Sequence, residues 1–402
     1  MRRKEACAAK FSRLPEVHFF WRNRYLNRRE FARLIGFTGA GFAARKLVPD
    51  SVPLYSSSKM KRRMDWVWIG TDTHTTADEW KKRFEVMRDA GIGAILPEIY
   101  NSREAFFGSK HLPVGQPWLE TILPLARDAG LDVHAWMWTM PCNVPSIVEK
   151  HPEWFVVNRL GESSTVKPAY VGYYKFLCPS RAEVWEFVGE TVSELSQISE
   201  LDGVHLDYIR YPDVILPVGL QPKYHIVQDK EYPQYDYCYC DVCRSEFRKE
   251  TGIDPIKLED PSSNADWNRF RYDRITHIVN DILRPIVHKR EKLLTAAVFP
   301  NWKNVRQQWS HWKLDGAMPM LYSRFYDEGV TWIGEQTKEE VDSQKYGAPV
   351  YSGLSVGQLS ADELASAVRV SSDSGGSGVS LFSAGSMTPE KWQSLKKALT
   401  TK

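Results

Sequence analysis

Residues 201–212 read Leu201-Asp-Gly-Val-His-Leu-Asp-Tyr-Ile-Arg-Tyr-Pro212, the pattern of a short buried strand that runs into a polar and aromatic corner. Side chains of a strand alternate between its two faces, so Val204 and Leu206 share one face while His205 and Asp207 share the other. In barrels of parallel strands, catalytic groups stand at the C-terminal strand ends. Asp207 is therefore the first candidate for a catalytic residue.

The same cycle of apolar strand, polar loop and amphipathic helix recurs along the chain. We expect eight strands, at residues 64–70, 93–99, 131–138, 203–207, 293–299, 316–322, 349–353 and 378–382. The helices that follow them are expected at residues 77–90, 118–129, 181–198, 266–290, 304–312, 338–346, 361–372 and 389–399. Eight such units predict an α/β fold of the (βα)8 TIM-barrel type, with insertions after the third and fourth strands.

A doubly wound parallel sheet is the alternative fold. It normally carries a glycine-rich, phosphate-binding turn after its first strand. Here that turn reads Gly70-Thr-Asp-Thr-His-Thr75, which has no such pattern. The barrel is therefore preferred.

Positive charge is concentrated at the start of the chain. The first 63 residues hold 16 Lys and Arg against 4 Asp and Glu, a net of 16 − 4 = +12. The whole chain carries +3, so the remainder carries 3 − 12 = −9. An acidic body argues against nucleic acid as a partner.

The basic start resembles an export signal of the twin-arginine type. Asn27-Arg-Arg-Glu-Phe31 precedes a Gly- and Ala-rich apolar segment at residues 34–44, and Arg45-Lys46 closes it. That segment is far shorter than the roughly 20 residues of a spanning helix. We expect a signal and linker at residues 1–58, a barrel at residues 64–400, periplasmic or extracellular localisation and no stable membrane span. A basic tail that contains Arg-Arg by chance is the alternative.

Aromatic side chains and carboxylates are expected to face the barrel mouth together. Period-two alternation places these residues inward near the strand ends: Trp68, Glu98, His134, Trp136, Trp138, Asp207, Phe299, Tyr322 and Phe382. Aromatic faces stack on the C–H surfaces of sugars, and carboxylates handle their hydroxyls and protons. We therefore expect a carbohydrate substrate. The predicted substrate-binding residues are Trp68, His134, Trp136, His205, Arg210, Tyr211 and Tyr322, with packed core residues as the alternative for the histidines and tryptophans.

Two carboxylates in one mouth are what cleavage of a glycosidic bond requires. We expect Asp207 to be the nucleophile or charge stabiliser, because Arg210 nearby would keep it ionised. Glu98 has apolar neighbours that would raise its pKa, which suits a general acid. Rival acids on mouth loops are Asp72, Asp241, Asp327 and Glu328.

The segment from Asp202 to Pro212 resembles the fourth-strand motif of the glycosyl-hydrolase-like family 10, in the wider α-amylase-like superfamily. Val133-His-Ala-Trp136 resembles the third strand of that family, and Pro319-Met-Leu-Tyr322 resembles its sixth. The resemblance covers about residues 64–390. It implies a (βα)8 barrel that acts on glycosidic bonds, and it supports Asp207 alone among the site residues.

Comparison with two other barrel types limits the mechanism. Chitinase-type barrels carry their acid two residues after the position of Asp207, where this chain has Ile209. Barrels of the α-amylase type carry a Glu acid on the fifth strand, which this chain lacks. The partner of Asp207 must therefore come from another strand.

Three cysteines lie close together in the second insertion, within Tyr237-Cys-Tyr-Cys-Asp-Val-Cys-Arg244. The spacing is compatible with a structural metal that takes Asp241 or Cys178 as its fourth ligand. A local disulfide is the other option in an exported protein. In either case we expect the run to brace a loop over the mouth, with no metal or cofactor in the active site.

The leading hypothesis is thus an exported glycoside hydrolase. A non-catalytic carbohydrate-binding barrel is the main alternative, favoured by the missing Glu on the fifth strand. A barrel enzyme acting on a phosphorylated metabolite, with Ser352-Gly353 and Ser383-Ala-Gly-Ser386 as a phosphate cradle, is a third option. The sugar, the linkage and the oligomeric state are open.

Overall fold

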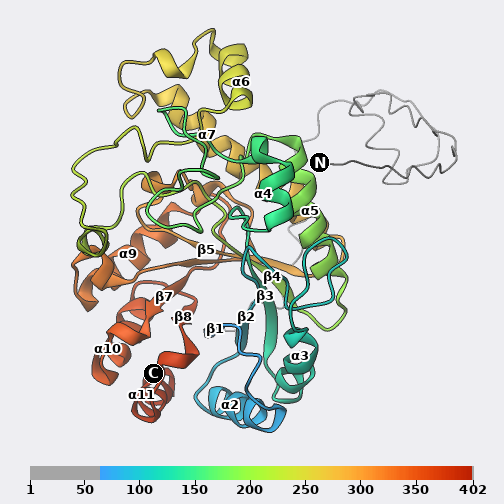
Figure 1. The fold of residues 1–402 in the computed structure, drawn as a ribbon. Helices are drawn as coiled ribbons and strands as arrows, with labels where there is room; N and C mark the ends of the chain where they lie inside the picture. Colours follow the sequence, from blue (N-terminus) through green and yellow to red (C-terminus); the bar gives the residue numbers. More distant parts are fainter. Residues whose placement is uncertain (1–63, 401–402) are drawn as a thin grey trace, which may run out of the picture. The chain divides into compact units, whose positions relative to one another are not determined.

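The structure, a computed structural model, describes residues 64–400, which form a barrel of eight parallel strands (Figure 1). Hydrogen bonds join the strands in the order β6-β5-β4-β3-β2-β1-β8-β7, and isolated bridges at Ala317–Val350 and Met320–Gly353 nearly close the barrel. The predicted (βα)8 fold is confirmed. The strands are β1 (Trp66–Ile69), β2 (Ala94–Tyr100), β3 (Asp132–Trp138), β4 (Gly203–Asp207), β5 (Leu293–Val298), β6 (Gly316–Pro319), β7 (Tyr351–Ser355) and β8 (Gly378–Phe382).

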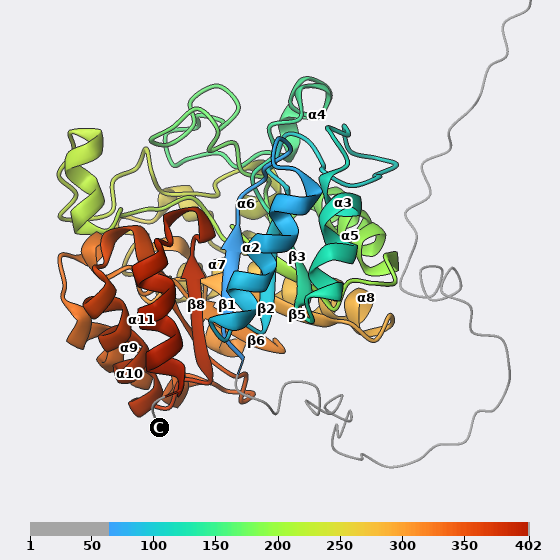
Figure 2. The same ribbon diagram turned by 90° about the horizontal axis from the view of Figure 1, so that it is seen from below.

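Helices cover the outside of the barrel, as α2, α3 and α11 do beside β1, β2 and β8 (Figure 2). They are α2 (Ala77–Asp89), α3 (Trp118–Asp128), α4 (Pro145–Lys150), α5 (Ala182–Gln197), α6 (Asp241–Thr251), α7 (Ala265–His277), α8 (Arg284–His288), α9 (Val330–Ser343), α10 (Ala361–Asp373) and α11 (Pro389–Thr400).

Two of the expected helices differ from the prediction. The segment at residues 304–312 forms only short 3₁₀ turns, Trp302–Val305 and Trp309–His311, because Arg306 between them takes a left-handed backbone conformation at φ 56°. Helix α9 begins at Val330, eight residues before the expected start. Its first turn has no acidic residue and its N-cap is Gly329, so the usual start signals are missing.

Period-two alternation in β4 is confirmed. Val204 and Leu206 face outward into the core between the sheet and the helices. The barrel interior holds a separate apolar cluster, which includes Trp66, Trp68 and Trp136. The strands are therefore buried on both faces, as parallel barrel strands are.

Four buried polar side chains lie in one layer of the barrel interior. Trp68 Nε1 donates to His205 Nε2 at 3.2 Å, and His205 Nδ1 lies 3.0 Å from Thr295 Oγ1. The same hydroxyl lies 3.2 Å from His134 Nδ1. These hydrogen bonds join β1, β3, β4 and β5 across the barrel. Burial lowers the pKa of His134 to about 4 and that of His205 well below its ordinary value.

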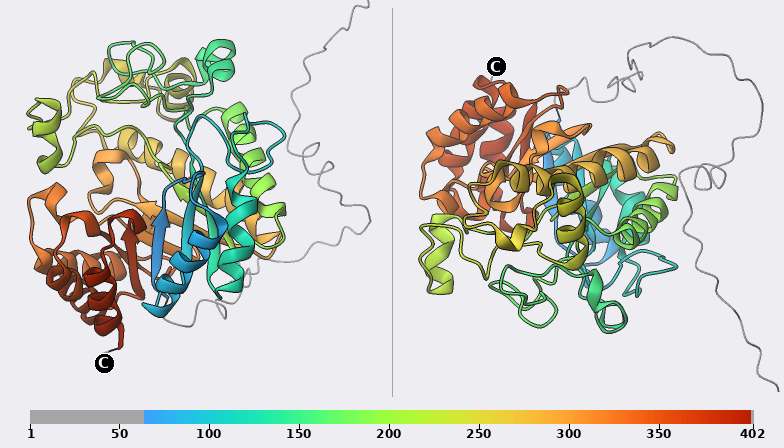
Figure 3. Two further views of the ribbon diagram at one scale, coloured as in Figure 1. Left: turned by 60° about the horizontal axis from the view of Figure 1, so that its bottom comes forward. Right: turned by 90° about the horizontal axis from the view of Figure 1, so that it is seen from above.

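Both predicted insertions lie on the side of the barrel at which the strands end (Figure 3, left). The first, after β3, carries α4, and the second, after β4, carries α6. They pair with each other, because Asn158 bridges to Tyr237 and Tyr239 N–H donates to Val157 O at 2.8 Å.

The expected signal lies outside the described residues. Within residues 64–400, every helix is too short or too polar to pass through a lipid bilayer.

Replacing Gly203 with Ala is expected to destabilise the barrel. A Cβ at this position would lie 2.5 Å from the His134 ring and 2.5 Å from Leu293 O. Neither neighbour can move without disturbing the buried polar layer, so the free energy of unfolding should fall by about 2–3 kcal/mol in guanidinium denaturation. The control is Gly172→Ala, where nothing lies within 4 Å. Equal stability of the two variants would contradict this account of the interior.

Candidate active site

A cavity of about 470 Å³ opens at the barrel mouth, where β1 to β5 and β8 end. Its wall is mostly aromatic, with carboxylates and one arginine between the rings. The lining includes Trp68, Glu98, Trp136, Trp138, Tyr173, Tyr174, Asp207, Tyr208, Arg210, Asp213, Tyr224, Phe299, Tyr322, Phe325, Tyr326 and Phe382. An apolar pocket with few convergent polar groups is the usual form of a small-molecule site.

Asp207 stands at the last position of β4 and is held by two donors. Its Oδ1 accepts the Tyr208 N–H at 2.7 Å, and its Oδ2 accepts the Trp136 indole N–H at 3.1 Å. Tyr208 has a left-handed backbone with φ 52°, which is costly for a residue with a Cβ and common at functional sites. Burial raises the pKa of Asp207 to about 6, although these two donors and the Arg210 charge act in the opposite direction.

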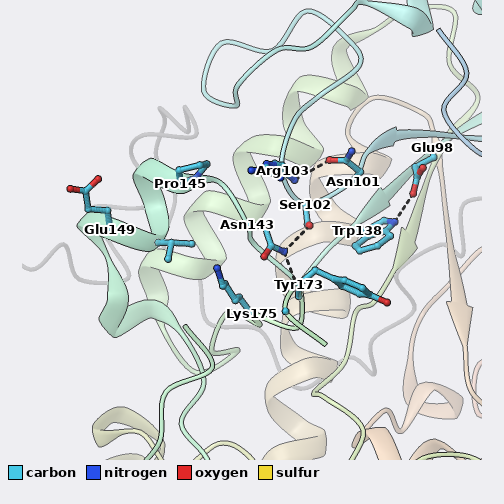
Figure 4. Close-up of a pocket in the computed structure, with 12 residues that line it drawn as sticks. Glu98, Asn101, Ser102, Arg103, Trp138, Asn143, Pro145, Glu149, Tyr173 and Lys175 are labelled. Carbon is cyan, nitrogen blue, oxygen red and sulfur yellow. Dashed lines mark hydrogen bonds between the residues drawn. The ribbon is translucent and has the colours of Figure 1, made fainter. Parts of the chain in front are cut away.

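Glu98 lies on β2, on the other side of β3 from Asp207. Its Oε1 accepts the Trp138 indole N–H at 2.8 Å (Figure 4), and Thr71 Oγ1 lies 3.4 Å from its Oε2. Burial raises the pKa of Glu98, because loss of hydration outweighs these hydrogen bonds. Trp136 and Trp138 share one face of β3, so each flanking carboxylate receives one indole donor.

Arg210 lines the cavity but does not pair with Asp207. Its guanidinium donates to Asp213 Oδ2 at 3.0 Å and to Tyr211 O at 2.9 Å, and both charged side chains are buried. The Arg210 charge lowers the pKa of Asp207, in the expected direction, but burial outweighs it. Tyr211 is buried outside the cavity lining and lies near the cysteines of the second insertion.

Apart from Tyr211, which is not at the cavity as predicted, the predicted substrate-binding residues divide into two groups. Trp68, Trp136, Arg210 and Tyr322 line the cavity, whereas His134 and His205 lie in the polar layer of the barrel interior. Both imidazoles are fully buried. The structure thus places both histidines in the packed core, which was the alternative to substrate binding, since period-two alternation predicts the face of a residue and not its height along the barrel.

The rival acids Asp72, Asp241, Asp327 and Glu328 do not line the mouth cavity. Asp72 accepts hydrogen bonds from Thr75 and Arg83, and these contacts, the Thr75 hydroxyl first, lower its pKa. Asp241 pairs with Arg181. Asp327 and Glu328 are exposed and do not line the cavity.

Several lining residues were missed by the sequence analysis. Tyr173 and Tyr174 come from the first insertion, and Tyr208 and Asp213 follow β4 directly. Period-two alternation does not extend beyond a strand end. The spacing of Arg210 and Asp213, three residues apart, was the one available signal for their ion pair.

A second hollow of about 800 Å³ adjoins the mouth cavity through three shared residues, Glu98, Trp138 and Tyr173 (Figure 4). It continues over the loop that follows β2 and over the first insertion, and both supply polar side chains to its lining. These include Asn101, Ser102, Arg103, Asn143, Glu149 and Lys175. The site is therefore an elongated groove with Glu98 at the junction of its two parts.

Thiols that could hold a metal lie outside this cavity lining. Cys178, Cys238, Cys240 and Cys243 form one buried group in the described chain. All cysteines among residues 64–400 are free thiols, so the structure does not form the local disulfide that was one option for this run. Asp241 is not part of the group, and Cys178 takes the fourth place.

The comparisons with known proteins point to carbohydrate-active barrels. Residues 63–365 match the family model described as Glycosyl hydrolase-like 10. The catalytic domain of β-amylase from Paenibacillus polymyxa superposes with a TM-score of 0.60 at 11% identity, covering 84% of this chain and 97% of that one. A β-galactosidase from Marinomonas ef1 superposes with a TM-score of 0.58 at 12% identity, covering 84% of this chain and 59% of that one. A β-galactosidase from Halorubrum lacusprofundi superposes with a TM-score of 0.60 at 12% identity, covering 83% of this chain and 57% of that one. No curated protein matches the chain.

The Asp207→Asn variant is expected to be more stable than the wild type at pH 7.5. Because the folded pKa of Asp207 is about 6 and its ordinary value is 3.8, the native state prefers the protonated carboxyl, and its stability falls as the pH rises between these values. The neutral amide avoids this loss, so the free energy of unfolding should increase by about 1–2 kcal/mol at pH 7.5 and by much less at pH 4.5.

Asp213→Asn is the matched control for this measurement. It removes the buried partner of Arg210 and should destabilise the protein by about 3 kcal/mol at pH 7.5. Thermal and denaturant unfolding at both pH values measure the two effects. A destabilised Asp207→Asn variant at pH 7.5 would show that its carboxylate is not under desolvation strain.

Proposed function

The chain belongs to the glycosyl hydrolase-like 10 family, and from this membership we propose that it is an exported glycoside hydrolase. Its substrate is a polysaccharide or a cell-wall glycan. One observation carries the proposal: two carboxylates with raised pKa values share one aromatic cavity at the barrel mouth. The names of the similar structures, a β-amylase and two β-galactosidases, support the same reaction class.

In the proposed mechanism, Glu98 is the general acid. Its carboxyl group donates a proton to the glycosidic oxygen, and the leaving sugar departs as an alcohol. Positive charge develops at the anomeric carbon, and the Asp207 carboxylate stabilises it or attacks it as nucleophile. Water then completes the hydrolysis. The reaction needs one proton on the pair, which suits two neighbouring carboxyl groups whose pKa values are raised.

The aromatic wall and the long groove fit a sugar polymer. Trp68, Trp136, Tyr322 and Phe382 offer ring faces or edges around Asp207, and rings of this kind stack on sugar C–H surfaces. The adjoining hollow has room for further sugar units, with Asn and Lys side chains for their hydroxyls. Export through the twin-arginine signal would bring the enzyme to such a polymer outside the cytoplasm.

A non-catalytic carbohydrate-binding barrel is the second candidate function. The end of β5, Val298-Phe299, supplies no carboxylate, and Phe299 is a wall residue of the cavity. In that case the aromatic mouth would bind sugar without cleaving it. Activity and binding measured on the same variants separate the two candidates.

Hydrolysis of a panel of polysaccharides, peptidoglycan included, tests the proposal. We expect the purified protein to release reducing ends from at least one polymer, and Asp207→Asn and Glu98→Gln each to lower kcat by a factor of 10² or more, on the order expected for acid–base catalysis. Both variants should still bind the polymer, as measured by calorimetry. Asp72→Asn, which changes a carboxylate outside the cavity lining, is the control and should keep full activity. Binding by the wild type without release of reducing ends would establish the binding barrel instead.

The pH profile tests the assignment of roles. If Asp207 acts ionised, kcat/KM rises as the pH increases through about 6. Trp136→Phe removes a donor that lowers the pKa of Asp207, so the acidic limb should move up by about 0.5–1 unit. Trp138→Phe removes the corresponding donor to Glu98, so it should raise the pKa of Glu98 and leave the limb near pH 6 in place. A kcat/KM that falls as the pH rises through 6 would reverse the two roles.

A further inference from the structure

Four cysteine side chains from two separate insertions meet in one buried group. Cys178 lies before α5 at the end of the first insertion, while Cys238, Cys240 and Cys243 lie at the start of α6 in the second. All four are at most 4% exposed. The Cys178 sulfur lies 3.5 Å from those of Cys240 and Cys243 and 3.7 Å from that of Cys238, and the four sulfur atoms lie within 4.8 Å of one another.

We propose that these four cysteines bind one zinc ion in a structural site. A tetrahedral zinc with Zn–S bonds of about 2.3 Å holds its sulfur atoms about 3.8 Å apart, close to the separations in this group. A disulfide would need two sulfurs at about 2.05 Å. Tetrahedral sites with four sulfur ligands are typical of zinc and iron, and zinc is the common choice where all four ligands are protein cysteines in a structural site.

The surroundings suit the charge of such a site. Zinc with four thiolates carries a net charge of −2, which must be balanced when it is buried. The Arg181 guanidinium, itself 8% exposed, also pairs with Asp241 and is within electrostatic range of Cys178, Cys238 and Cys240. Ser180 Oγ lies 3.1 Å from the Cys243 sulfur and would donate a hydrogen bond to the thiolate. Cys240 is the N-cap of α6, where the helix dipole favours negative charge.

The site would act as a cross-link and not as a reaction centre. Four protein ligands leave no open position for water or substrate on a tetrahedral zinc. Cys178 follows Tyr173 and Tyr174 of the cavity wall by only a few residues, and the second insertion supplies Asp213 and Tyr224. The ion would therefore fasten together the two insertions that build the mouth.

Metal analysis of the full-length protein, purified without a histidine tag, tests the proposal directly. We expect one zinc per chain by inductively coupled plasma mass spectrometry. An organomercurial that blocks thiolates should release this zinc to a chromogenic chelator, and should lower the Tm by about 5 °C or more. Replacement by Co²⁺ should give the thiolate charge-transfer and tetrahedral d–d bands of a four-sulfur site.

Matched variants locate the ion. Cys240→Ser should reduce the zinc content at least tenfold, while Cys142→Ser, which changes a buried cysteine outside the group, should keep one zinc per chain. The wild-type measurements stand even if Cys240→Ser fails to fold. Zinc below about 0.1 per chain with free thiols, iron in place of zinc, or disulfides among the four cysteines would each overturn the assignment. None of these outcomes depends on the protein having hydrolase activity.

Discussion

A hydrogen-bonded chain across the barrel interior is the constraint on which the rest of the structure depends. The Trp68 indole donates to His205 Nε2, so the other nitrogen of this neutral imidazole carries the proton and donates to Thr295. The Thr295 hydroxyl is then free to donate to His134. These hydrogen bonds pair every nitrogen and hydroxyl of the chain except His134 Nε2, and each further unpaired polar group in a dry barrel would cost several kcal/mol. Four strands are thereby held at one height.

The active-site geometry follows from that height. Trp136 and Trp138 lie on β3 further toward the mouth than His134, and each indole orients one carboxylate on a neighbouring strand. Asp207 and Glu98 are thus positioned by strands and not by loops, which fixes the position of each carboxylate relative to the other. The insertions add tyrosines to the cavity wall, Tyr173 and Tyr174 from the first and Tyr208 and Tyr224 from the second.

Sequence patterns predicted the strands well, because each is short, apolar and bounded by turn residues. They also predicted that His205 and Asp207 face inward, since alternation depends only on strand geometry. Height along the barrel depends on strand stagger, which the sequence does not show, and so His134 was expected near the mouth, with a packed core residue as the alternative. Beyond the strand ends, contacts depend on loop conformation, which is why the ion pair of Arg210 with Asp213 was missed.

That ion pair decides the electrostatics of the site. An arginine beside Asp207 would have kept it ionised far into the acidic range, leaving no proton for the pair near neutral pH. The Arg210 guanidinium pairs with Asp213 and lies over the rings of Tyr208 and Phe299. Its field at Asp207 is therefore too weak to cancel the rise in pKa that burial causes. Asp207 and Glu98 therefore compete for a proton in a weakly hydrated cavity, and ionising one raises the pKa of the other. A pair in that state keeps its proton to a higher pH than two separate, hydrated carboxyl groups would, which suits acid-assisted cleavage of a glycosidic bond.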